Sequence, residues 1–186
     1  MIGLRWPWLT LAVAAIMLLF VTAQTIWPEL IGHLRWEAER VLAGEVWRMA
    51  SGAFIHTNGP LQIIFNLVGL LFIGWFVEQH WSRLAWSVAF VGGVLAAELF
   101  AILWYPVGGG LSVGLGGLVG LTLAGWARYR EVRWIVRVPL VLLYLAGTAY
   151  VIYLQDLHGP PIIAGALVGI VMARSRRTFT LLREHG

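Results

Sequence analysis

Two side-chain amides stand one helical turn apart in an otherwise apolar stretch. Gln62 and Asn66 lie at the beginning of the apolar run 61–77, which is long enough to form a helix. Because helical positions i and i+4 share a face, the two amides can converge on one point. Amides in such a stretch either form hydrogen bonds between helices or donate to the oxyanion that develops during acyl transfer. The pair therefore indicates either a packing contact or part of a catalytic site.

A hydroxyl and an imidazole that could act together occur later in the chain. Ser112 opens a glycine-rich apolar stretch, and His158 stands just before Pro160 and Pro161. A histidine within reach of a serine can accept its proton and turn the hydroxyl into a nucleophile. The structural alternatives are a serine that caps or packs the start of a helix and a histidine in an exposed loop. Which role applies depends on the elements that position the two residues.

The composition predicts that those elements are membrane-spanning helices. Of 186 residues, 60% are hydrophobic and 12% are charged, whereas a soluble domain carries about a quarter charged residues. At about 20 residues per span, the chain holds six spans and no soluble domain. We therefore expect an all-α polytopic protein whose residues 1–186 form a single membrane domain. Cysteine is absent, which excludes disulfides and thiolate ligands. We find no metal-ligand spacing or nucleotide motif, so no metal or other cofactor is predicted.

Apolar runs with charged ends locate the six spans. They are expected at about 8–21, 61–77, 84–104, 111–126, 139–154 and 160–173, with a long external segment at about 23–59. The first apolar run, followed by Val21-Thr22-Ala23, could also be a secretory signal with its cleavage site. Because five further spans follow, a retained first span is the simpler interpretation.

The arginines indicate the orientation of the spans. If the spans alternate, ten of the 13 arginines fall on one side and the other side holds three, which are Arg35, Arg40 and Arg48. Cytoplasmic loops carry the excess of basic residues, so both termini are expected in the cytoplasm of a multi-pass protein of the cell membrane. Topology thus explains the positive charge, and nucleic acid is not an expected partner.

The orientation also sets the depth of the two candidate catalytic residues. The fourth and sixth spans run in the same direction, and Ser112 and His158 each lie 16 residues before an arginine, Arg128 and Arg174 respectively. At 1.5 Å per residue, both are roughly 24 Å from the cytoplasmic charge layer. We therefore expect them at similar depth, where glycines on both helices would allow close approach.

Two other features have more than one interpretation. The external segment carries Trp27, Trp36 and Trp47 among alternating charges, which is compatible with short amphipathic helices in the membrane interface or with a simple aromatic belt. Glu98 lies within the third span. As a buried acid it would need a partner such as Arg48 or a hydroxyl, although it could also reach the outer interface.

Several motifs resemble those of the rhomboid family of intramembrane serine proteases. Gly44-Glu45-Val46-Trp47-Arg48 is similar to the family's G-x-x-W-R, and it precedes Phe54-Ile55-His56, which is similar to F-x-H. The family then has a second histidine and an asparagine one turn apart on the second span. Here these positions hold Gln62 and Asn66, with one extra residue before Gln62. The resemblance covers roughly residues 44–173 and implies a six-helix bundle in which Gln62 and Asn66 contribute to the oxyanion site.

The resemblance leaves two registers open for the catalytic pair. The family has G-x-S-G on the fourth span and H-x-x-G-x-x-x-G on the sixth. On the fourth span, a serine position at Ser112 matches Gly110, Gly117 and Gly120 but has Val113 where a glycine is expected, whereas one at Gly116 matches Gly114 and Gly117 and leaves no nucleophile. On the sixth span, Gly165 and Gly169 fit the family spacing with Ile162 in place of the histidine. Ser112 and His158 each lie four residues earlier, so the pair could instead be displaced together by one turn.

The resemblance therefore implies one of two functions. The first is an intramembrane serine endopeptidase in which Ser112 and His158 cleave single-span membrane proteins in or beside their transmembrane segments. The small six-span core is also similar to the rhombosortase branch of the family. The second is an inactive rhomboid, a pseudoprotease that binds membrane helices. In either case the lipid bilayer is the expected surrounding.

Overall fold

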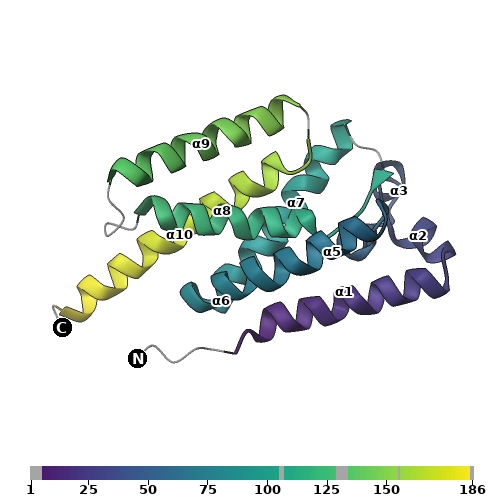
Figure 1. The fold of residues 1–186 in the computed structure, drawn as a ribbon, viewed down its shortest axis with the longest axis horizontal. Helices are drawn as coiled ribbons and strands as arrows, with labels where there is room; N and C mark the ends of the chain where they lie inside the picture. The colour runs from purple at the N-terminus through teal and green to yellow at the C-terminus, as the bar shows by residue number, and fades with distance from the viewer. Residues whose placement is uncertain (1–5, 105–106, 129–133, 155, 185–186) are drawn as a thin grey trace.

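The computed structural model describes the backbone of residues 6–104, 107–128, 134–154 and 156–184, and it is a bundle of α-helices (Figure 1). The long helices are α1 (Trp8–Ile26), α5 (Pro60–Gly69), α7 (Arg83–Trp104), α8 (Ser112–Arg128), α9 (Trp134–Tyr153) and α10 (Gly159–Glu184). The short ones are α2 (Glu29–Leu34), α3 (Ala38–Leu42), α4 (Arg48–Ser51), η1 (Gly52–Phe54), η2 (Leu70–Gly74) and α6 (Trp75–His80).

Helices occupy all six places where spans are expected, with boundaries shifted by up to a few residues except at three ends, one of which is the start of α9, five residues before the predicted one. α1 runs five residues beyond the predicted end, and α10 continues from the predicted sixth span to Glu184. Among the described residues, three helices are long and apolar enough to cross a membrane, namely α1, the continuous segment Pro60–His80 and α7. Shorter apolar helices lie at Ser112–Gly125 and Gly159–Met172. A helical membrane bundle is thus confirmed, while the count of six spans stays a prediction.

The outer surface of the bundle is apolar. Large hydrophobic side chains on α1, α5, α7 and α10 are exposed, including Leu19, Phe65, Leu99, Leu103 and Val171. Exposed apolar surface on this scale is unfavourable in water, whereas helices satisfy their own backbone hydrogen bonds and can present such side chains to lipid. The chain is therefore a membrane protein.

The second predicted span is one continuous helical segment with a widened turn. Pro60 takes the first helical position of α5 after Gly59, whose φ is 81°. The π-helical turn η2 follows, and α6 completes the segment. A π turn within an α-helical segment is rare and is frequently found at functional sites. Here Gly74 lies against Thr10 of α1, and a Cβ atom at position 74 would be 3.0 Å from the Thr10 side chain.

Three helices, α7, α8 and α10, pack most closely. Leu111, Leu118 and Leu121 at the start and along α8 are fully buried. On one side of α8, a Cβ atom at Gly93 would lie 2.8 Å from the Val113 carbonyl oxygen. On the other side, Gly165 of α10 faces the Gly117 carbonyl oxygen with no space for a side chain. Small residues thus allow the backbones to meet, as is common between membrane helices.

The N-terminal helix is tied to the bundle at both ends by buried polar groups. Glu78 accepts hydrogen bonds from the Leu9 and Thr10 backbone N–H groups, at 3.2 and 3.1 Å, and from the Thr10 hydroxyl. An acid suits the start of a helix because the first N–H groups have no intrahelical acceptor. Near the other end, the Gln24 amide exchanges two 3.0 Å hydrogen bonds with the backbone of His56.

The external segment folds around a buried arginine. Arg48 is 1% exposed; its Nε donates to Glu45 at 2.7 Å and its Nη1 donates to the carbonyls of Gly32 and Arg35, each at 3.0 Å. The short helices predicted for this segment are present as α2, α3 and α4. Arg48 pairs with Glu45, and the pairing with Glu98 considered from the sequence is not found among the described residues.

One feature of this region departs from an all-α fold. The two-residue strands β1 (Trp36–Glu37) and β2 (Val107–Gly108) pair antiparallel, with Trp36 opposite Gly108 and Glu37 opposite Val107. The pairing attaches the external segment to the residues just before α8. It therefore helps to place the start of α8, where the candidate site lies.

Candidate active site

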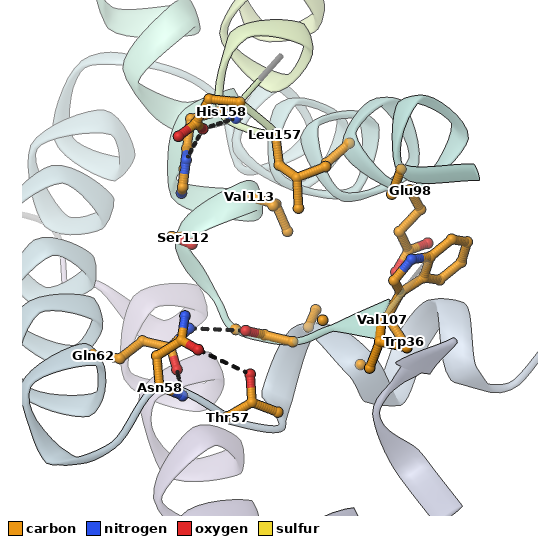
Figure 2. A pocket seen from close by; sticks show the side chains of 18 residues that line it. Trp36, Thr57, Asn58, Gln62, Glu98, Val107, Ser112, Val113, Leu157 and His158 are labelled. Carbon is orange, nitrogen blue, oxygen red and sulfur yellow. Dashed lines mark hydrogen bonds and ion pairs between the residues drawn. The ribbon is translucent and has the colours of Figure 1, made fainter. Parts of the chain in front are cut away.

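A cavity of about 380 Å³ lies at the end of the bundle where α8 and α10 begin. Its walls come from the external segment, the start of α5, α7, β2 and the glycine run after it, the start of α8 and the residues before α10 (Figure 2). Its polar side chains are those of Trp36, Thr57, Asn58, Gln62, Glu98, Ser112, Asp156 and His158. The volume is at the small end of the range for ligand pockets in proteins. The cavity is the candidate functional site.

Ser112 is the first residue of α8 and lines this cavity. Backbone contacts fix its position: the Gly110 N–H donates to the Gly52 carbonyl at 3.0 Å, and Gly110 has a φ of 137°. A Cβ atom at Gly109 would lie 2.5 Å from the Ile55 carbonyl oxygen. The glycines before Ser112 therefore allow the chain to pass close to the backbone of residues 52–55, which no larger residue would permit.

His158 lines the same cavity, and Asp156 orients it. The His158 ring Nδ1 lies 2.5 Å from Asp156 Oδ1, and the same oxygen accepts the His158 backbone N–H at 2.9 Å. Burial alone would raise the pKa of the Asp156 carboxyl, but the hydrogen bonds from His158 outweigh it and lower that pKa. With Nδ1 engaged by the carboxylate, Nε2 is the ring atom left to meet another group.

The predicted displaced pair is thus placed in one cavity. Figure 2 shows the His158 ring extending from the residues before α10 toward the start of α8, where Ser112 lies. No hydrogen bond joins the two side chains in the part of the chain that the structure describes. Unliganded sites often hold such pairs farther apart than they are during reaction. Ser112 and His158 therefore share a site, and a catalytic role for them stays a prediction.

The alternative register, Gly116 and Ile162, falls at the contact between α8 and α10. A Cβ atom at Gly116 would lie 2.8 Å from Pro161 Cβ and 3.7 Å from the His158 carbonyl oxygen. One turn further along, Gly120 lies against the Ile162 carbonyl oxygen, again with no room for a side chain. In this register the position of the family's serine is filled by helix packing, and no nucleophile fits there without moving α10.

The two amides lie beside the glycine run. Gln62 Nε2 donates to the Gly109 carbonyl at 2.8 Å, and Gln62 Oε1 accepts the Asn58 backbone N–H at 3.0 Å. Asn66 is 4% exposed, and its Nδ2 has no hydrogen-bond partner. Gly110 lies against both amides, since a Cβ atom there would be 3.5 Å from Asn66 Nδ2 and closer still to Gln62. Gln62 therefore positions the residues before Ser112, whereas Asn66 keeps a free donor.

Two contributions to the site were not recognised in the sequence. Asp156 is not among the predicted site residues, yet it holds His158 through two hydrogen bonds. Trp36 was interpreted as part of an aromatic segment, yet the β1–β2 pairing brings it to the cavity wall. The spacing of Asp156 and His158 is a sequence signal for the role of Asp156. No sequence signal indicates the place of Trp36, because Trp36 and its paired residue Gly108 are about 70 positions apart.

Fold and site together define a helical membrane protein with a polar cavity at the end of a closely packed helix trio. The family model described as Rhomboid domain matches residues 43–178, and the chain belongs to the rhomboid family. One similar curated protein is the inactive RHOMBOID-like protein 8 of Arabidopsis thaliana, which is 29% identical over 102 residues. The match covers 54% of this chain and 28% of that relative.

Proposed function

We propose that this protein binds membrane-spanning segments of other proteins and holds them without cleaving them. The observation that carries the proposal is the close contact between Gly116 and Pro161. A Cβ atom at Gly116 would lie 2.8 Å from the Pro161 Cβ atom. One of the two registers that align with the family places the catalytic serine there. In that register the position holds packed backbone in place of a nucleophile, which supports a family fold without the family's reaction centre.

The cavity supplies a place for a bound segment. It is lined by the external segment and the starts of α8 and α10, among other elements, and its lining combines apolar side chains such as Val107 and Leu157 with several polar groups. An apolar helix end that enters the cavity would bury its side chains there and meet donors and acceptors that the membrane lacks. The word inactive in the name of the Arabidopsis relative supports the same proposal. The proposal includes the orientation inferred from the arginines, with both termini cytoplasmic and the cavity on the external side.

Cross-linking tests the proposal directly. A photoreactive amino acid is placed at Val107, which is 42% exposed and lines the cavity, and a matched one at Leu142 of α9, which is 60% exposed and outside the cavity lining. After illumination in native membranes, we expect adducts with uncleaved single-span proteins from position 107 and few from position 142. Equal capture at both positions would contradict a binding site at the cavity.

A second candidate function is hydrolysis, and the Asp156–His158 contact favours it. In this candidate His158 Nε2 takes the Ser112 proton, and Ser112 Oγ attacks the carbonyl carbon of a peptide bond in or beside the substrate's transmembrane segment. The C–N bond breaks as the proton passes from His158 to the leaving amine, and a water molecule deprotonated by His158 then hydrolyses the acyl-enzyme. The free Asn66 amide, and Gln62 once released from Gly109, would donate to the oxyanion. Cleavage of a labelled single-span protein that is lost on Ser112→Ala would establish this candidate in place of the first.

A further inference from the structure

Glu98 is a buried acid on the cavity wall, and none of the described residues is its partner. It lies on α7, its exposed fraction is 5%, and its Oε2 has no hydrogen-bond partner. The mechanism considered above does not use it. A carboxyl group removed from water without a partner is unfavourable, so the site is incomplete without a group that can donate to this oxygen.

The arginines of the neighbouring external segment do not fill this role. Arg48 donates to Glu45 and to two carbonyls, and Arg35 pairs with Glu37 at 3.6 Å. In the described part of the chain no ion pair reaches Glu98. Among the described residues none supplies this donor, and a basic group of a bound molecule can supply it.

The surroundings of Glu98 suit a long basic side chain. In the view of Figure 2, Glu98, Trp36 and Val107 line one side of the cavity, and Ser112, Asn58 and Gln62 line the other. An ammonium or guanidinium group is attracted both to a carboxylate and to the face of an indole ring. The methylene stem of such a side chain needs an apolar wall, which Ala97, Ala101, Val107 and Leu157 provide.

We infer that the cavity recognises a lysine or arginine near the external end of the bound membrane segment, with Glu98 as its counter-ion. The depth of Glu98 in the bundle agrees with a basic residue near the external end of a bound segment. Glu98 is six residues before the end of α7 at Trp104, or about 9 Å along the helix. Basic residues at this depth of a membrane helix extend toward the interface. The inference rests on the proposed binding of membrane segments and names the class of segment that is bound.

The test uses two synthetic Leu-rich membrane helices that differ at one position. One carries lysine six residues from its external end, and the other carries methionine there. Since the chain has no cysteine, one cysteine introduced at exposed His33 takes a single dye, and energy transfer to labelled peptide in nanodiscs reports binding. We expect the lysine peptide to bind about 10- to 100-fold more tightly than the methionine peptide. Glu98→Gln should abolish the difference, whereas Glu98→Asp and the exposed-acid control Glu39→Gln should keep it.

The outcomes separate this inference from the proposed function. Equal binding of both peptides would overturn the role of Glu98 and leave segment binding intact. A preference for lysine that survives Glu98→Gln would also overturn it. If neither peptide binds, the proposed function fails, and the inference fails with it. Thermal unfolding of each variant shows that the fold is retained, and the Glu98→Asp variant keeps the test decisive if Glu98→Gln does not fold.

Discussion

The close contact between α8 and α10 predicts that Gly165→Ala lowers the free energy of unfolding. A Cβ atom at Gly165 would lie well inside 3.0 Å of the Gly117 carbonyl oxygen, a separation that real Cβ atoms essentially never show. Because the obstacle is backbone, no change of rotamer relieves it, and α10 must move away from α8. Overpacking of this kind costs typically about 1–3 kcal/mol, and we expect the upper end.

The matched control is Gly92→Ala on α7. A Cβ atom at Gly92 would meet nothing within 4 Å, so this substitution adds a methyl group without a clash. Alanine is favoured over glycine inside a helix by about 1 kcal/mol, which also partly offsets the clash at Gly165. We therefore expect a net loss of about 2 kcal/mol for Gly165→Ala and no loss for Gly92→Ala.

Tryptophan fluorescence during thermal unfolding in detergent measures both variants. For a chain of this size, a loss of 2 kcal/mol lowers Tm by about 4–8 °C. The Tm of Gly165→Ala could equal that of the unmodified protein, or Gly92→Ala could lower Tm as much as Gly165→Ala does. Either result would refute the reasoning that close glycine contact holds α8 to α10.

Three further predictions concern the external segment and the site. Arg48→Met leaves the Gly32 and Arg35 carbonyls without their donor and removes one of the two arginines that donate to Glu45, so we expect a loss of about 2–3 kcal/mol in the same unfolding assay. Gln62→Met removes two hydrogen bonds and should lower stability by about 1–2 kcal/mol, whereas Leu61→Met at the exposed neighbouring position should not. Burial lowers the pKa of His56 from the usual 6.5, so the folded state binds fewer protons than the unfolded state below that pH. Tm should therefore be constant above about pH 6.5 and fall as the pH drops below it, and His56→Asn should remove this part of the pH dependence.

The positions of the helices could be predicted from the sequence because each is a local property. Apolar runs bounded by charged residues, such as the run that became α7, carry the signal within about 20 residues. The proximity of Ser112 and His158 to one cavity followed from their equal distance to Arg128 and Arg174, since two parallel helices place equal offsets at equal depth.

Contacts that join distant residues could not be predicted in the same way. The pairing of Trp36 with Gly108 involves two-residue strands, which are too short for any alternation pattern to appear. Similarly, the free space beside Gly116 or Ser112 depends on where Pro161 packs. The residues around positions 112 and 116 in the sequence do not indicate that packing. Both registers could be recognised in the sequence, but the space around the serine position of each register could not be predicted from it.

The reactivity of Ser112 tests the central claim most directly. The purified protein is incubated in nanodiscs with a fluorophosphonate, which modifies activated serine nucleophiles, and the intact mass is measured. Binding without cleavage predicts an unchanged mass, with the same result for Ser112→Ala. An added phosphonyl group that maps to Ser112 and is absent from Ser112→Ala and from His158→Ala would contradict the claim and identify a working serine–histidine pair.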